Sequence, residues 1–298
     1  MLAVLLPSIA GIFLDPRLVT GAPVWLKPAK FAASTGIFAF SIAWLFRYMT
    51  MNRALKRNLG LLLGFILMLE VGLIDLQAWR GVASHFDISS PVNSTIYAVM
   101  GTSIGVLWAT TIFLTVALFR QSFANAGWGS ALRYGMLISV LGAGLSGFML
   151  RPTPEQSATM AQHVRPEYIG AHTVGAPDGG PGIEPMGWSK QHGDLRIPHF
   201  FGLHALQILP LLALLIRRKS LASAEQQTRM VLSTAVSYGA LLGILTWQAL
   251  RGQSIIEPDG ITVAALAIWF CATAGAMLWS RYACVEEVGL SQLARKPI

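Results

Sequence analysis

The residues of this chain best suited to chemistry are ionisable side chains that interrupt long apolar stretches. Glu70 and Asp75 lie within the stretch 58–80, and His204 lies within the stretch 198–216. A titratable group is costly in hydrocarbon, so each of these residues is a functional candidate by default. Carboxyl and imidazole groups exchange protons readily. We therefore predict that Asp75 and His204 act as catalytic acid/base or ligand groups and that Glu70 tunes them.

Basic and amide side chains cluster at the ends of these and neighbouring stretches. Such side chains can hold an anionic portion of a substrate through charge-assisted hydrogen bonds. The predicted ligand-binding residues are Lys30, Arg80, His199, Arg196, Gln77, Gln248 and Arg251. A second interpretation stays open for the arginines, because long basic side chains at a membrane edge also extend toward the polar interface.

Histidines raise the question of a metal or haem cofactor. His199 and His204 are five residues apart, about 140° around a helix, so a single ion would not easily bind both. His85, His204 and Asp75 together would offer the mixed nitrogen and oxygen ligands that suit zinc or a non-haem metal. The same two histidines, His85 and His204, could instead hold haem b. The sequence leaves the cofactor open among these alternatives.

The elements that position these residues follow from composition, which excludes an ordinary soluble domain. The chain is 54% hydrophobic and 12% charged, with a mean hydropathy of +0.56. Apolar runs suited to crossing about 30 Å of hydrocarbon recur along nearly its whole length. These runs predict an all-α integral membrane protein with eight spans, at residues 1–14, 29–49, 58–80, 91–118, 130–150, 198–216, 226–250 and 260–281.

The net charge of +8 does not indicate a nucleic-acid partner, because the basic residues occupy alternate connections. They lie between the second and third spans, between the fourth and fifth, between the sixth and seventh, and after the eighth. Examples are Arg47, Arg53, Lys56 and Arg57 in the first of these connections. Basic residues mark cytoplasmic segments. The pattern therefore predicts a multi-pass protein in a lipid bilayer, with both termini in the cytoplasm.

Two pairs of segments indicate an internal duplication. Residues 26–31 match residues 195–200, and residues 77–81 match residues 248–252, at offsets of nearly the same length. Each match lies where an apolar run meets a polar segment. We predict one transmembrane domain, 1–298, made of two four-helix repeats of the same orientation, about 1–120 and 130–285.

The connection 151–197 is the one long departure from this repeat. Thr153 and Gln156 form a capping-box pattern with a proline at the first helical position, which predicts a short helix to about Gln162. The glycine- and proline-rich run 175–182 cannot be helical. The interleaved aromatic and aliphatic residues of the whole connection 151–197 favour a periplasmic lid over the outer mouth of the bundle.

Residues 21–31, 80–85 and 171–207 are distinctive as a set. Together they resemble an uncharacterised group of bacterial multi-pass inner-membrane proteins, and the resemblance covers most of the chain. It implies a location in the bacterial inner membrane. It also implies that the lid and the outer ends of the second, third and sixth spans are characteristic of the group, but it implies no activity.

Unusual polar residues are concentrated in the outer half of the predicted bundle. We therefore predict a periplasm-facing intramembrane site that binds a small or lipid-like ligand or a cofactor and could act on it. Two alternatives are a secondary transporter, proton-coupled through Glu70, and a structural or assembly subunit of a membrane complex.

Overall fold

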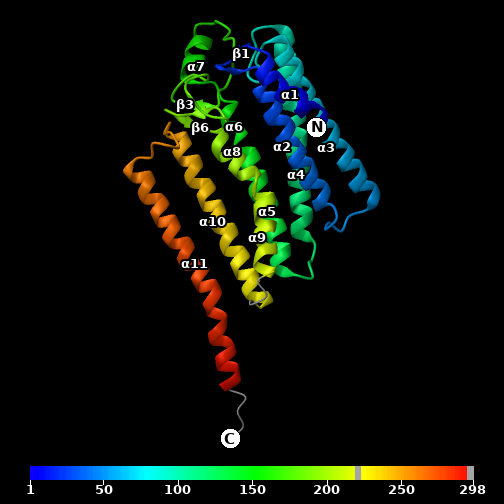
Figure 1. Ribbon diagram of the computed structural model, residues 1–298, viewed down its shortest axis with the longest axis vertical. Helices are drawn as coiled ribbons and strands as arrows, with labels where there is room; N and C mark the ends of the chain where they lie inside the picture. Colours follow the sequence, from blue (N-terminus) through cyan, green and yellow to red (C-terminus); the bar gives the residue numbers. More distant parts are fainter. Residues whose placement is uncertain (219–222, 294–298) are drawn as a thin grey trace.

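The structure is a computed structural model. It describes the backbone of residues 1–218 and 223–293 and, apart from Leu2, the side chains of those residues up to Arg281. The described chain is mostly helical (Figure 1). Its helices are α1 (Leu2–Leu14), α2 (Leu26–Leu45), α3 (Arg53–Arg80), α4 (Pro91–Arg120), α5 (Ala126–Gly144), α6 (Ser146–Met149), α7 (Pro154–Ala161), α8 (Arg196–Leu203), α9 (Ala205–Arg218), α10 (Ala224–Leu250) and α11 (Gly260–Leu293).

Within the described residues, six short strands form three two-stranded antiparallel sheets. β1 (Leu18–Val19) pairs with β2 (Ala22–Pro23), β3 (Thr173–Val174) with β6 (Gly193–Asp194), and β4 (Gly182–Ile183) with β5 (Trp188–Ser189). All of them lie at one end of the helical bundle (Figure 1).

The prediction of an all-α membrane protein is confirmed at the level of its long apolar helices. In the described chain, α3, α4, the segment Ala126–Met149, α10 and the Gly260–Arg281 part of α11 are long and apolar enough to cross a membrane. α8 and α9 together would make a sixth span, bent by 44°. All eight predicted apolar runs coincide with helical structure. Eight spans remain a prediction, because α1 has only 13 residues and α2 is not among the five.

A glycine pair brings α5 and α8 into direct backbone contact beside this bend. A Cβ atom added to Gly142 would lie 2.5 Å from the Cα atom of Gly202, a distance that no side chain allows. At the bend, the Tyr238 hydroxyl of α10 donates to the carbonyl of Phe201 at 2.6 Å. A broken helix is tolerated inside an apolar bundle when its freed backbone groups find partners in this way.

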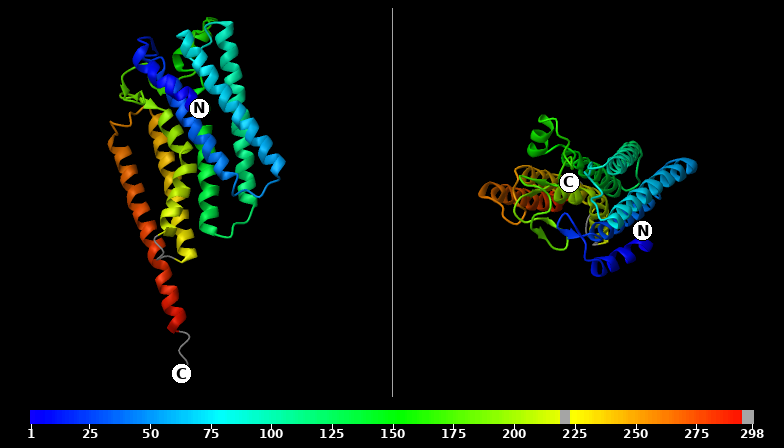
Figure 2. Two further views of the ribbon diagram at one scale, coloured as in Figure 1. Left: turned by 45° about the vertical axis from the view of Figure 1, so that its right-hand side comes forward. Right: turned by 90° about the horizontal axis from the view of Figure 1, so that it is seen from above.

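The tightly packed core lies mainly in the half of the bundle opposite the small sheets. Its largest cluster joins α2, α3, α4, α5 and α9 and contains Ile42, Leu45, Met49, Leu63, Leu114, Leu118, Leu132, Met136, Val140 and Leu206. A second cluster joins α5, α9 and α10 and contains Ile138, Ala205, Leu209, Ala235, Tyr238 and Leu242. α11 packs along α10 and extends beyond the other helices (Figure 2).

The segment between α6 and α8, residues 150–195, is called the lid segment below. It contains α7, whose predicted capping box is confirmed: the Thr153 hydroxyl accepts from the Gln156 amide nitrogen, and the Gln156 side chain accepts from the Thr153 amide nitrogen. A β-bridge between Asp87 and Tyr168 ties the lid segment to the loop between α3 and α4. The lid segment and that loop lie at the same end of the bundle (Figures 1 and 2).

Candidate ligand-binding site

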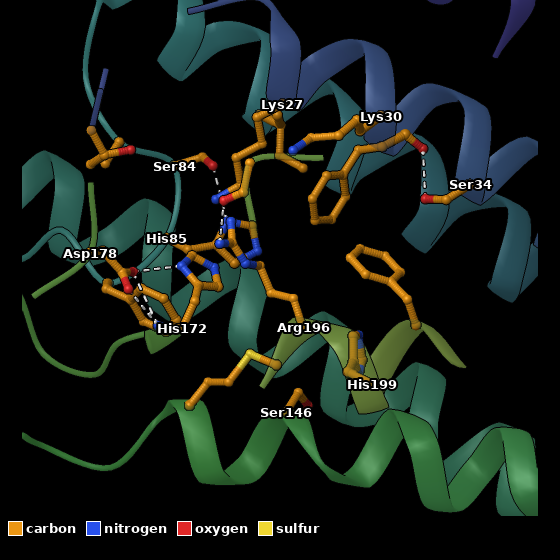
Figure 3. A pocket seen from close by; sticks show the side chains of 18 of the residues that line it. Lys27, Lys30, Ser34, Ser84, His85, Ser146, His172, Asp178, Arg196 and His199 are labelled. Carbon is orange, nitrogen blue, oxygen red and sulfur yellow. Dashed lines mark hydrogen bonds and ion pairs between the residues drawn. The ribbon is translucent and has the colours of Figure 1, made fainter. Parts of the chain in front are cut away.

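A cavity of about 950 Å³ occupies the half of the bundle nearer the lid segment. One wall comes from α2, α3 and α4, and the other from α5, α6 and α8. The lid segment and residues 82–86 form its roof (Figure 3). A cavity of this volume is large enough for a drug-sized or lipid-like molecule.

Three basic side chains from opposite walls meet beneath the roof (Figure 3). Lys27 and Lys30 come from the N-terminal end of α2, and Arg196 is the first residue of α8. The Lys30 ammonium donates to the carbonyl of Met186 in the lid segment at 2.8 Å. Arg196 forms a two-point ion pair with the buried carboxylate of Asp194, with its Nε at 2.9 Å and its Nη2 at 2.5 Å.

The positive charge beneath the roof is only partly balanced. The two nearby carboxylates, Asp178 and Asp194, are already engaged, the first by His172 and the second by Arg196. Lys27 has neither a hydrogen bond nor an ion pair within the described chain, and its ammonium lies 5.9 Å from the ring centre of Phe31. The head of the cavity therefore has spare hydrogen-bond donors and unbalanced positive charge.

His172 and Asp178 form a hydrogen-bonded pair within the lid segment. Nδ1 of His172 lies 2.6 Å from Oδ2 of Asp178, and the same carboxylate accepts from the backbone nitrogens of His172 and Thr173. Burial lowers the pKa of His172 more than Asp178 raises it. Burial alone would raise the pKa of Asp178, but the hydrogen bonds from His172 hold it well below its usual range. A neutral imidazole therefore donates from Nδ1, which leaves Nε2 with a free lone pair.

His85 lies in the roof beside this pair (Figure 3). Its Nδ1 is 3.0 Å from the hydroxyl oxygen of Ser84, and its ring lies against Phe31 with the ring centres 5.6 Å apart. Burial, then the charge of Lys27 and the neighbouring His172, lower the pKa of His85 well below its usual value. His85 is therefore neutral at physiological pH and adds no charge to the cluster.

His199 lies on α8, one turn below Arg196, and also lines the cavity. Its Nδ1 is 2.8 Å from the carbonyl of Gly142 on α5. A carbonyl only accepts, so Nδ1 carries the proton and Nε2 is the free acceptor. The glycine crossing of α5 and α8 thus fixes the orientation of this imidazole.

Further from the roof, the cavity wall is largely apolar. Lining residues there include Phe38, Leu67, Ile104, Leu107 and Trp108. Glu70 lines this part too and is only 2% exposed. Its Oε1 atom is 2.9 Å from the hydroxyl oxygen of Ser103, and its Oε2 atom has no hydrogen-bond partner in the described chain. The cavity therefore joins a basic head to an apolar body that contains one acid.

The structure brings six of the predicted site residues into one cavity: Lys30, Glu70, His85, Arg196, His199 and His204. Gln77 and Arg80 do not line it and instead complete the end of α3. The Gln77 amide donates to the carbonyl of Ala83 at 3.2 Å, and Arg80 donates to Oδ1 of Asn93 at 2.8 Å and contacts the Gln77 side chain. These two residues hold a helix terminus, so their predicted contact with a ligand is not supported.

The end of α10 has the same construction. The Gln248 amide donates to the carbonyl of Ser254, six residues further on, at 2.9 Å, just as Gln77 does to Ala83. Arg251 pairs with Asp259. The glycine after each of these arginines has a left-handed φ, +72° and +73°. Gln248 and Arg251 are likewise absent from the cavity wall.

The predicted acid/base pair of Asp75 and His204 is not assembled. Asp75 lies on α3 outside the cavity wall, and its Oδ1 atom is buried without a hydrogen-bond partner in the described chain. His204 lines the cavity at the bend between α8 and α9, where its Nδ1 is 3.3 Å from Oε1 of Gln207. It is the sole member of the pair in the cavity.

The described residues contain no group of three or more His, Cys, Asp or Glu side chains that could hold a metal ion. His85 lies in the roof beside Phe31, whereas His204 is eight residues along the chain from Arg196, about 12 Å of helix. The pairing of His85 with His204 around one ion stays a prediction.

Sequence reasoning missed the His172–Asp178 pair and the central position of Lys27. The two pair members are six residues apart in an irregular segment, a spacing with no helical or strand periodicity to mark it. The available signal was that Asp178 is the one carboxylate within the turn-forming run 175–182. Lys27 was expected at the rim of the predicted polar site or at the membrane edge, not at the centre of the site.

Comparison with known proteins adds no assignment to this geometry. No protein-family model, no curated protein and no solved structure matches the chain. The functional argument therefore depends on the cavity itself.

Proposed function

We propose that this protein binds an amphiphilic ligand with an anionic head group, in an intramembrane cavity that faces the periplasm. The observation that carries the proposal is the pair of lysines, Lys27 and Lys30, above an apolar cavity body. Neither ammonium has a carboxylate partner within the described chain. An anionic group such as a phosphate or carboxylate would supply both the charge and the hydrogen-bond acceptors that they lack.

The shape of the cavity supports an amphiphile over a small hydrophilic anion. Its basic residues are confined to the roof end, while Phe38, Leu107 and Trp108 line the opposite end. A small anion would leave this apolar volume to water. A hydrocarbon chain would fill it and gain roughly 25 cal/mol per Å² of apolar surface removed from water.

The membrane setting of the proposal is the bacterial inner membrane, with eight spans, both termini cytoplasmic and the lid segment periplasmic. The matching ends of α3 and α10, with Gln77 equivalent to Gln248 and Arg80 to Arg251, support an origin by duplication. The basic residues at the other end of the bundle support the orientation. The last residues of the proposed cytoplasmic C-terminus, 294–298, lie outside the described residues.

Catalysis on the bound head group is the second candidate function, and the His172–Asp178 pair favours it. An imidazole whose Nδ1 is held by a carboxylate presents Nε2 as a proton acceptor. Replacing His172 with Gln should then leave ligand binding intact and stop conversion, so unconverted ligand should co-purify with the variant. Identical co-purified ligands in both proteins, detected by mass spectrometry, would exclude this second function.

Binding of decyl phosphate to detergent-purified protein tests the main proposal. A charge-assisted hydrogen bond contributes about 1.5–3 kcal/mol, so replacing either lysine with Gln should weaken binding about tenfold or more. Lys190→Gln is the matched control, because Lys190 is an exposed lysine of the same lid segment and does not line the cavity. Calorimetry that shows equal affinity for Lys27→Gln, Lys30→Gln and the control would refute the proposal.

A further inference from the structure

The two walls of the cavity are joined differently on their two sides. On one side, α4 packs on α5, and Nε1 of Trp108 donates to the carbonyl of Val140 at 3.0 Å. On the other side, α2 faces α8 across the cavity (Figure 3). α2 packs mainly on α1 and α3, whereas α8 and α9 pack mainly on α5 and α10. This second side is therefore held by local contacts rather than by helix packing.

At the roof end of this side, the β4–β5 hairpin bridges the two walls. Lys30 of α2 donates to the carbonyl of Met186 at 2.8 Å, and Nη2 of Arg196 donates to the carbonyl of Gly187 at 2.7 Å. Two consecutive carbonyls of one turn thus use donors of two cations from opposite walls. Carbonyls are neutral acceptors. An anionic head group can replace them, because it accepts stronger charge-assisted hydrogen bonds.

At the far end of this side, one hydrogen bond joins α2 to α9. The Gln207 amide donates to the Ser41 hydroxyl at 2.8 Å, and it is the sole hydrogen bond between α2 and either α8 or α9 among the described residues. Ser41 is eleven residues beyond Lys30, about 16 Å of helix. The part of this side between the hairpin and the Gln207–Ser41 contact is called the slot below.

The edges of the slot belong both to the cavity wall and to the outer surface of the bundle. Ile37 of α2 lines the cavity and is 47% exposed, and Phe40, one turn along, is exposed outside the cavity. His204 is the exposed cavity-lining residue of the opposite edge, and Leu211, two turns along α9, is exposed outside the cavity. The slot therefore connects the cavity with the apolar surface that would face lipid.

We infer that the ligand is a membrane lipid that enters the cavity sideways through the slot, with its head group at the roof end and its hydrocarbon chain between α2 and α8–α9. This inference rests on the proposed function and adds the source of the ligand, which is the bilayer rather than water. Lys30 and Arg196 lie at the roof end of the slot. The head group therefore reaches them without crossing the apolar body, and it takes the place of the hairpin carbonyls.

A cross-link across the slot tests this route. Ile37→Cys and His204→Cys are combined in a protein whose native cysteines, Cys271 and Cys284, are replaced with Ser, and a bis-maleimide joins the two new thiols. The locked protein is then placed in nanodiscs that contain hexadecyl phosphate with a diazirine in its chain. Mass spectrometry follows photo-cross-linking to cavity peptides over time. Loading should be at least tenfold slower than in the same protein without the cross-linker.

The matched control is a cross-link on the other side of the cavity, between α4 and α6. Gly105 and Gly147 line the cavity there with open space at their Cβ positions, so Gly105→Cys with Gly147→Cys introduces the same chemistry. This lock should load like the unlocked protein. Equal loading with the slot locked and unlocked, or a block by the control lock alone, would overturn the inference while the proposed function stands. Absence of cavity labelling in every protein, together with no binding of decyl phosphate in detergent, would overturn both.

A second variant tests the slot without a cross-link. Gln207→Leu removes the hydrogen bond to Ser41 at the far end and should speed loading about two- to tenfold, the effect of one hydrogen bond on opening. Thr273→Val is the matched control, because it removes a hydrogen bond between α11 and Ser237 of α10, away from the cavity. Gln207→Leu that loads no faster than this control would count against entry through the slot.

Discussion

Replacing Asp178 with Asn should loosen the lid segment without changing its shape. The carboxylate accepts hydrogen bonds from the backbone nitrogens of His172 and Thr173 and from Nδ1 of the His172 ring. Asn keeps one oxygen for the backbone donors, but its amide group cannot accept from the imidazole. The substitution therefore removes the charge-assisted contact at 2.6 Å and preserves side-chain volume.

The size of the effect follows from the strength and exposure of that contact. A hydrogen bond to a charged group contributes about 1.5–3 kcal/mol. The two side chains are 21% and 22% exposed, so solvent screens the pair only in part. We expect the free energy of opening the lid segment to fall by about 1.5–3 kcal/mol, which raises the open population about tenfold to a hundredfold.

Amide hydrogen exchange of β3 measures this population, because the Thr173 amide is itself bonded to Asp178. Exchange there should accelerate by that factor, while exchange in α3 stays unchanged. Glu184→Gln is the matched control, since Glu184 is an exposed acid of the same segment that does not line the cavity. Protection of β3 within twofold of wild type would show that this carboxylate does not hold the lid segment.

Two further predictions concern acidity and the helix crossing. The pKa of His172 is lowered by burial and that of Asp178 lies below its usual range, so the open lid segment binds more protons than the closed one. Its stability should therefore fall as the pH drops through about 6.5 and again near 4, and β3 exchange corrected for intrinsic rates should show both steps. A flat profile would contradict the neutral state assigned to His172. Gly142→Ala should destabilise the protein by about 1–3 kcal/mol, because the added methyl group would lie 2.5 Å from the Cα atom of Gly202. The control is Gly147→Ala, whose added methyl group has open space around it. This control should unfold like wild type in a fluorescence-monitored thermal melt. Equal melting of these two alanine variants would mean that the crossing of α5 and α8 readjusts at no cost.

Several local features could be predicted from the sequence because neighbouring residues determine them. The apolar runs coincide with helices, and both hydrogen bonds of the predicted capping box at Thr153 are present. The bend in the sixth run was not foreseen. Two groups that contact the helix beside the bend, Gly142 of α5 and the Tyr238 hydroxyl of α10, are remote from it in the chain.

The candidate site was predicted in part. The pattern of basic residues at the ends of apolar runs predicted Lys30 and Arg196 as ligand-binding residues, and both line the cavity. The same reasoning selected Arg80 and Arg251, which hold helix ends instead. An arginine at the end of an apolar run can bind a ligand or hydrogen-bond to the end of its own helix. Its neighbours in the sequence do not distinguish these two roles.

The sequence by itself determined the apolar helices, the mixture of acids and bases available, and the depth of each polar residue along its helix. Only the tertiary structure decided which of these residues share a site. Glu70 and Asp75 are five residues apart on α3, about 140° around the helix. One lines the cavity and the other does not, because packing against the neighbouring helices sets the rotation of α3. Lys27 and Arg196 meet beneath the roof from opposite walls, an encounter that depends on the placement of two distant helices.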